Sequence, residues 1–327
     1  MKEYFSRIVA VALAIFAVTC FVACGDDDDN DDMSAGSVPS PTLKDANGNA
    51  VQVTQVGNIW FRYNADGTLE SFGDGSDSYS IEGSTFTISD ESNTYNVSIA
   101  LNGSGLITKI HAKMNATSSN GSYEKDDITM NFSYSSNRQL SSCSATGSGS
   151  YYEKQYDESE SYSGSSNVKY TWSNDNLTQV VIDTKQTGKE DGMSYSEREK
   201  GTFVFSYGEQ ANPVRQFPYF VGEEVVADDL GGLFCIVGLF GYGPAYFPTG
   251  YTETWKEDGE KDETNSYSLS YTLNDNGTIN TEQKGSYYRV TYQYNTVATR
   301  AIVNAGTAEE IVRAVKSQFK NYFKHKH

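Results

Sequence analysis

Apolar and small polar residues alternate along much of this 327-residue chain. Residues 128–134 read Ile-Thr-Met-Asn-Phe-Ser-Tyr, and residues 267–273 read Tyr-Ser-Leu-Ser-Tyr-Thr-Leu. Successive side chains of a β-strand point to opposite faces, so a period of two predicts a strand with one buried face. A chain built of such segments has to bury one face of a sheet, and we therefore expect an all-β fold.

The alternating segments belong to a recurring unit, in which a strand is followed by a short polar turn and then by an aliphatic residue. The first strands of the units end at Tyr63, Leu101, Tyr134, Trp172, Tyr207 and Leu273. The second strands open at Leu69, Ile107, Leu140, Leu177, Val214 and Ile279. Turns such as residues 64–67 and 274–277 end in Gly, which permits the positive φ of a tight hairpin. We expect an antiparallel meander of hairpin repeats, curled into a half-barrel or open barrel.

One interval of the array, between Tyr207 and Leu273, is longer than the others and holds an apolar tract from Leu230 to Phe240. Fair helix formers precede the tract, so we expect a short helix over residues 223–230 and a buried plug, within an insert spanning residues 221–250. The insert either caps an open end of the sheet or lines a ligand site.

The C-terminal residues 301–327 predict an amphipathic helix. Residues 307–310 read Thr-Ala-Glu-Glu, which is a capping box. Apolar residues then recur every four positions from Ile311 to Phe323, and basic residues occupy the other faces. Docking on its own domain is the first interpretation, and binding to a partner or a membrane surface is the alternative.

The first 24 residues have the regions of a secretory signal, with Lys2 and Arg7 followed by an apolar stretch that ends before Cys24. Residues 21–25, Phe-Val-Ala-Cys-Gly, resemble a bacterial lipobox. This resemblance implies cleavage before Cys24 and attachment of a lipid to its thiol, although Phe21 replaces the usual aliphatic residue. An ordinary signal with an incidental cysteine is the alternative.

The residues directly after Cys24 are strongly acidic, and their run begins with Asp26, Asp27, Asp28 and Asp29. By charge alone this run is a solvated spacer, and residues 25–50 form an acidic, flexible tether ahead of a hairpin-repeat domain at 51–300. It also resembles the export signal of Bacteroidetes lipoproteins. That resemblance implies an anchored protein on the outer membrane that faces the cell exterior, with a periplasmic location as the alternative.

The hairpin unit at residues 61–69 resembles the YD-type repeat of RHS proteins. Together with the lipobox, the aspartate run and residues 238–249, it is similar to a Bacteroidetes family of surface lipoproteins with a domain of unknown function. The resemblance covers most of the chain, and it implies the fold and the location but no catalytic residues.

Charge and composition exclude several classes of function. A formal net charge of −18 repels phosphate backbones, so we expect no nucleic-acid partner. Contact with the membrane is expected only through the N-terminal lipid. Cys143 and Cys235 are expected to be buried free thiols, with a disulfide as the alternative.

Catalytic and metal-binding machinery is sparse in this sequence. His111 stands alone on a predicted strand, so neither a zinc cluster nor a catalytic triad is expected. The acids at 126–127 and 257–263 are expected in solvated turns, and the turns at 64–67 and 274–277 lack the acids of a calcium loop. We therefore expect neither a cofactor nor an enzyme.

Aromatic residues are abundant, with 24 Tyr and 16 Phe. Most are expected in the core, but Tyr287, Tyr151 and Tyr152 are candidates for stacking on a ligand, with cross-strand pairing as the alternative.

We expect a surface-exposed, lipid-anchored protein with a non-catalytic binding or adhesion role towards a glycan or a protein. An envelope scaffold or a carrier of a hydrophobic ligand is the first alternative, and an apolar cavity inside the sheet would favour it. A glycan-active enzyme is the second alternative, and convergent carboxylates in a cleft would favour it.

Overall fold

The computed structural model describes residues 43–296 except 66, 75–76, 81–84, 90–92, 118–120, 155–156, 227–233 and 258–261. Between residues 69 and 101, side chains are described at 69–73 and 96–101 only. The predicted signal, Cys24, Asp26–Asp29, most of the tether and the C-terminal helix lie outside these residues. No helix among the described residues has both the length and the apolar character needed to cross a membrane.

The described chain consists almost entirely of strands. Its elements, in order, are β1 (Leu43–Lys44), β2 (Ala50–Val56), β3 (Ile59–Tyr63), β4 (Leu69–Asp74), β5 (Asp77–Ser80), β6 (Thr85–Ser89), β7 (Asn93–Leu101), β8 (Ile107–Thr117), β9 (Tyr123–Tyr134), β10 (Leu140–Glu153), β11 (Glu158–Ser173), β12 (Asn176–Glu190), β13 (Met193–Ala211), α2 (Tyr219–Val226), β14 (Tyr246–Glu257), β15 (Glu263–Leu273), β16 (Ile279–Lys284) and β17 (Tyr288–Thr296).

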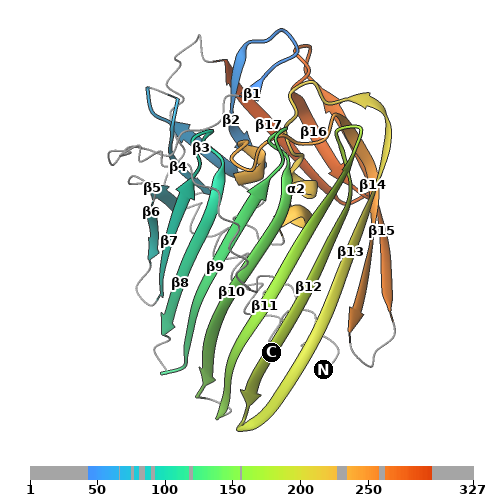
Figure 1. The fold of residues 1–327 in the computed structure, drawn as a ribbon. Helices are drawn as coiled ribbons and strands as arrows, with labels where there is room; N and C mark the ends of the chain where they lie inside the picture. The colour runs from blue at the N-terminus through green and yellow to red at the C-terminus, as the bar shows by residue number, and fades with distance from the viewer. Residues whose placement is uncertain are drawn as a thin grey trace, which may run out of the picture.

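The strands form one antiparallel sheet in which sequence neighbours pair (Figure 1). The pairing runs from β6 to β17, and β17 pairs in turn with β2, where Tyr292 lies opposite Val56. It continues from β2 to β5. The sheet therefore curls strongly on itself. The predicted meander, curled into an open barrel, is confirmed.

The recurring turns share one hydrogen-bond pattern. The backbone N–H groups of Asn64, Asn102, Ser135 and Asn274 each donate to the carbonyl oxygen four residues later, at 2.8–2.9 Å. The residue before that acceptor has a positive φ and is a glycine in three of these turns, while Arg138 takes this position in the fourth with a φ of 60°. This is a three-residue hairpin loop that ends in a left-handed residue, and it explains the frequent spacing of six residues between strand end and strand start.

Aromatic residues at or near three strand ends fasten their hairpins to the preceding ones. The Tyr134 hydroxyl donates to the carbonyl of Ile107 at 2.6 Å. The indole N–H of Trp172 donates to Leu140, and the Tyr207 hydroxyl donates to Leu177, both at 2.7 Å. The recurring aromatic residue thus satisfies a carbonyl at the start of the neighbouring second strand.

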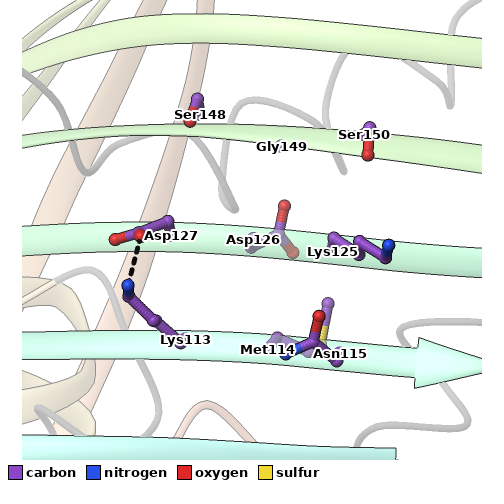
Figure 2. A pocket seen from close by; sticks show the side chains of 9 residues that line it. All are labelled: Lys113, Met114, Asn115, Lys125, Asp126, Asp127, Ser148, Gly149 and Ser150. Atoms are coloured by element: carbon purple, nitrogen blue, oxygen red, sulfur yellow. Dashed lines mark ion pairs between the residues drawn. The ribbon is translucent and has the colours of Figure 1, made fainter.

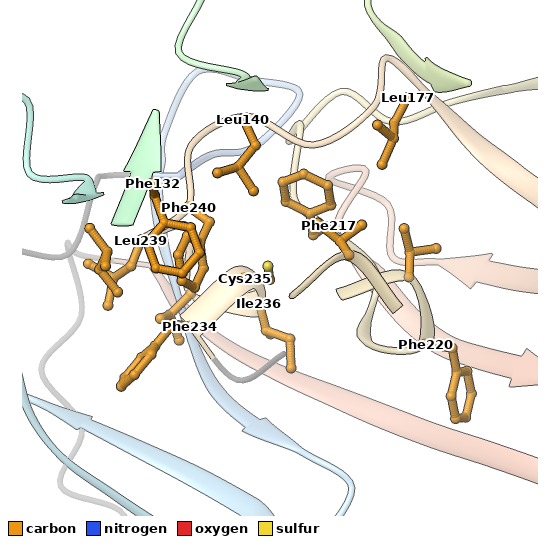
Figure 3. Packing of buried hydrophobic residues seen from close by; sticks show 14 of the residues in the cluster. Phe132, Leu140, Leu177, Phe217, Phe220, Phe234, Cys235, Ile236, Leu239 and Phe240 are labelled. Atoms are coloured by element: carbon orange, nitrogen blue, oxygen red, sulfur yellow. The ribbon is translucent and has the colours of Figure 1, made fainter. Parts of the chain in front are cut away.

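The described part of the apolar tract, residues 234–240, lies inside the curled sheet (Figures 1 and 3). We call these residues the plug. Phe240 packs on Phe132 with ring centroids 4.7 Å apart, and Phe234 meets Phe72 edge to face at 5.9 Å. Neither plug phenylalanine is more than 1% exposed. The predicted buried plug is therefore confirmed.

The short helix begins earlier than the sequence predicts, at Tyr219 instead of Glu223. Its first N–H groups are capped from a distant strand, because the Glu282 carboxylate accepts from the backbone of Tyr219 and Phe220 at 2.7 and 3.1 Å. A cap so far away in the sequence gives no local signal.

Two sequence predictions are wrong. Val214 opens no strand. The side-chain amide of Asn212 donates hydrogen bonds to the carbonyls of Gln216 and Pro244, and Arg215 has a φ of 58°, so the chain turns here. The pair Asp126 and Asp127 lies within β9, not in a turn, because both neighbours of β9 extend past it in register.

Cys143 and Cys235 are both free and buried, as predicted. Burial raises the pKa of the Cys143 thiol to about 12, so the thiol stays protonated at neutral pH.

Candidate functional site

Strands β8–β15 extend well beyond the plug towards one end of the molecule (Figure 1). In β11, Ser166, Val168 and Tyr170 are buried while Asn167 and Lys169 are exposed, so even-numbered residues of this strand point inward. The registers extend this assignment to the neighbouring strands. We call the inward-facing side chains beyond the plug the distal inner face; it includes Glu124, Asp126, Tyr151, Tyr162, Tyr195 and Trp255.

A row of alternating tyrosine and glycine crosses this face perpendicular to the strands. Tyr195 of β13 lies opposite Gly188 of β12, and Gly188 lies opposite Tyr162 of β11. Tyr162 in turn lies opposite Gly149 of β10, and Gly149 opposite Asp126 of β9. We call these five residues the tyrosine–glycine row.

Both tyrosine rings of the row lie across the glycine beside them. A Cβ atom at Gly149 would be 2.4 Å from Cζ of Tyr162, and one at Gly188 would be 2.7 Å from Cζ of Tyr195. Only glycine allows this approach, in which an aromatic ring covers the backbone of the next strand. The rings are half-buried, so they cover the sheet while part of their surface faces the interior of the curl.

Hydrogen bonds fix the direction of each ring. The Tyr195 hydroxyl donates to Oε1 of Glu160 at 2.6 Å and accepts from the amide of Gln186. The Tyr162 hydroxyl donates to Oδ1 of Asp126. Burial and the Glu160 carboxylate raise the pKa of Tyr195, so its hydroxyl remains a donor at neutral pH.

A third aromatic ring lies over glycine on the same face, nearer the plug. A Cβ atom at Gly201 of β13 would be 2.6 Å from the Trp255 ring on β14. The indole also packs edge to face on Phe203, with centroids 5.7 Å apart. Beside it, the Tyr267 hydroxyl donates to Glu253 at 3.1 Å. The distal inner face therefore combines ring surfaces with hydrogen-bonding carboxylates.

A separate hollow of about 310 Å³ spans β8, β9 and β10 (Figure 2). Most of its lining residues, including Lys113, Lys125 and Asp127, point outward from the sheet. Lys113 and His111 contact the two Asp127 oxygens at 3.0 and 2.8 Å, so these groups satisfy one another. The hollow offers no aromatic surface, and we do not assign a ligand to it.

The other sequence candidates are dispersed. Tyr287 is 92% exposed between β16 and β17, away from the row. Tyr152 points outward and packs on Tyr123 across the strand pair at 5.9 Å, which is the expected cross-strand pairing. Tyr151 points inward and joins the distal inner face. No group of potential metal ligands occurs among the residues that the structure describes.

No protein-family model and no curated protein matches this sequence. Among solved structures, a porin-like protein from Bacteroides vulgatus is 14% identical, with coverage of 74% of this chain and 98% of its own and a TM-score of 0.43. A porin-like protein from Bacteroides uniformis is 16% identical, with coverage of 64% and 95% and a TM-score of 0.25. Likenesses this distant support no argument about the role of this chain. Its membership of the lipoprotein family and its resemblance to YD-type repeats stay predictions.

Proposed function

We propose that this protein is anchored by lipid to the bacterial outer membrane, faces the cell exterior and binds an extended glycan on its distal inner face without catalysis. The observation that carries the proposal is the row of Tyr195 and Tyr162, each lying over a glycine, together with Trp255 over Gly201.

Rings that lie along a sheet present their faces, and sugar rings bind proteins by stacking on such faces while their hydroxyls form hydrogen bonds. Carboxylates beside the rings supply strong acceptors for those hydroxyls, as Glu160 and Glu253 already do for tyrosine hydroxyls. Since the row crosses several strands, it suits a ligand of several sugar units. A protein ligand has less support, because large apolar residues are few among the described residues of this face.

The alternatives have weaker support from the described residues. A carrier of a hydrophobic ligand needs apolar space inside the sheet, and the plug occupies the apolar interior around Phe132 and Phe72. A glycan-active enzyme needs a carboxyl group free to give or take a proton. At the tyrosine–glycine row, both Asp126 and Glu160 accept hydrogen bonds from tyrosine hydroxyls, which favours a binding role.

Binding is tested with a panel of soluble oligosaccharides and with Tyr162→Ala in the full mature chain. We expect the variant to lose most of its glycan affinity, since stacked rings contribute strongly to recognition. Tyr152→Ala is the matched control, because this residue is also a tyrosine of a long strand but points outward. Equal loss in both variants, or no binding of any glycan by wild type, would refute the proposed site.

Anchoring is tested separately in cells. Cys24→Ala should release the protein from the membrane fraction. Replacement of Asp26–Asp29 by Ala should leave it lipidated but protected from protease added to intact cells. If this second variant is still digested from outside, the aspartate run is not the export signal.

A further inference from the structure

Charge is divided between the two faces of strands β8–β15. Side-chain alternation and the strand registers place every lysine and arginine of these strands on the outward face, for example Lys113, Lys125, Lys169, Lys185, Lys200 and Lys256. The inward face carries most of the acids, among them Glu124, Asp126, Glu160, Glu190, Glu197 and Glu253. The chain as a whole has a formal net charge of −18, and the inward acids concentrate this negative charge on the distal inner face.

The acids of this face act together on the aromatic groups among them. Burial, followed by the negative charges of Glu153, Glu158, Glu124 and Glu160, raises the pKa of Tyr151 to about 12. These carboxylates come from three different strands, so the sheet gathers them around one ring. A cation would find both carboxylates and the electron-rich faces of aromatic rings here.

A buried acceptor without a donor lies in the same place. Gln186 is 3% exposed and points inward from β12, where it lies opposite Glu197 of β13. Its amide nitrogen donates to the Tyr195 hydroxyl, but its Oε1 has no hydrogen-bond partner. Buried acceptors are nearly always satisfied in folded proteins, so this oxygen can accept a donor from a ligand.

We infer that the ligand of the distal inner face is an amino glycan, whose free amines are protonated and lie among the inward carboxylates while its sugar rings stack on Tyr162, Tyr195 and Trp255. This inference rests on the proposed function and specifies its ligand. Ammonium groups provide both a positive charge, which strands β8–β15 do not place on this face, and N–H donors for acceptors such as Gln186. The nearest basic group is Lys284 of β16, which already pairs with Glu224 at 3.0 Å. A glycan that carries carboxylate or sulfate groups would be repelled by the same face.

Three probes with the same linkage separate charge from ring stacking: oligomers of glucosamine, of N-acetylglucosamine and of glucose. Binding to the full mature chain is followed by calorimetry and by tryptophan fluorescence, since Trp255 lies on the face. We expect the glucosamine oligomer to bind at least about tenfold more tightly than the other two, because a charged hydrogen bond contributes about 1.5 to 3 kcal/mol. Its advantage should shrink as salt is added.

Two pairs of substitutions remove equal charge from opposite faces. Glu160→Gln with Glu197→Gln should weaken glucosamine-oligomer binding about tenfold or more. Asp127→Asn with Asp183→Asn removes two outward acids and should leave the affinity unchanged. Where the inner pair fails to fold, Glu190→Gln is compared with Asp127→Asn alone, because Glu190 is exposed on the same inward face and each variant then removes one charge.

The outcomes distinguish this inference from the proposed function. If neutral oligomers bind as tightly as glucosamine oligomers and Tyr162→Ala still abolishes binding, the ligand class is wrong and the glycan site stands. If the outer pair weakens binding as much as the inner pair, attraction is nonspecific and the inference fails. If oligolysine of equal charge binds as well and Tyr162→Ala has no effect, the face binds polycations and both conclusions fail.

Discussion

Glu282 provides the sharpest test of the energetics of this fold. The residue lies on β16 and is fully buried. Its carboxyl group accepts hydrogen bonds from the backbone N–H groups of Tyr219 and Phe220, at the start of α2, and from the Tyr292 hydroxyl at 2.5 Å. Burial raises its pKa from 4.5 to about 8, and these donors act against the rise.

A raised pKa in the folded state means that the protonated carboxyl is the form that folding favours. Its contribution to stability is complete below about pH 4.5 and is lost as the pH rises towards about 8. A difference of one between the folded and unfolded pKa values corresponds to about 1.4 kcal/mol. The difference between 4.5 and about 8 therefore changes the free energy of unfolding by roughly 5 kcal/mol. This is a large share of the stability of a typical domain.

Glu282→Gln replaces the titrating group with a neutral one of the same shape, whose NH₂ can donate to the Tyr292 hydroxyl. We expect the free energy of unfolding of the variant, minus that of wild type, to increase by about 1.4 kcal/mol per pH unit from about pH 5 to about pH 8 and then to level off. Urea unfolding of both proteins across this range measures the difference, in which all other titrating groups cancel. A difference that is constant with pH would show that the donors hold the carboxylate ionised and that the reasoning is wrong.

Three further predictions concern the row, the plug and the C-terminus. Gly188→Ala should displace Tyr195 and crowd the Ser161 carbonyl, and Gly201→Ala should displace only Trp255; each should cost about 1 to 3 kcal/mol in urea unfolding. Gly103→Ala, at a position with open space, should be nearly neutral, and an equally neutral Gly201→Ala would contradict the ring placement. Phe234→Ala should cost about 3 to 5 kcal/mol, and a variant that melts like wild type would place this ring outside the core. Deletion of residues 305–327 should lower the melting temperature if the predicted helix docks on the domain; unchanged melting, with no protection from amide exchange in the full chain, would contradict docking.

Local patterns account for the parts of the fold that the sequence predicts correctly. The alternation at 128–134 and 267–273 and the glycine-ended turns at 64–67 and 274–277 act within a few residues. Each therefore has the same consequence wherever it occurs in the chain. The predicted plug follows from a similar argument, because an apolar tract in a polar chain has to be buried.

The candidate site does not follow from the sequence. Because acids are common in turns, the sequence predicts a turn at Asp126, and this prediction is wrong. Tyr162 and Tyr195 have no local feature that distinguishes them from the other strand tyrosines. The glycines at 149 and 188 are the only local signal, since glycine is unfavourable inside a strand unless another group needs its space. Even so, they do not show which aromatic residue covers them.

The strand class, most of the turns and the presence of a plug follow from the sequence, because these depend on neighbours within about ten residues. Strand pairing across the sheet, in contrast, places Tyr195, Gly188, Tyr162, Gly149 and Asp126 in one row, although the outermost two are 69 positions apart in sequence. A shift of one residue in any of these pairings would move a side chain to the other face. The register, set by the turns and the core together, therefore creates the site.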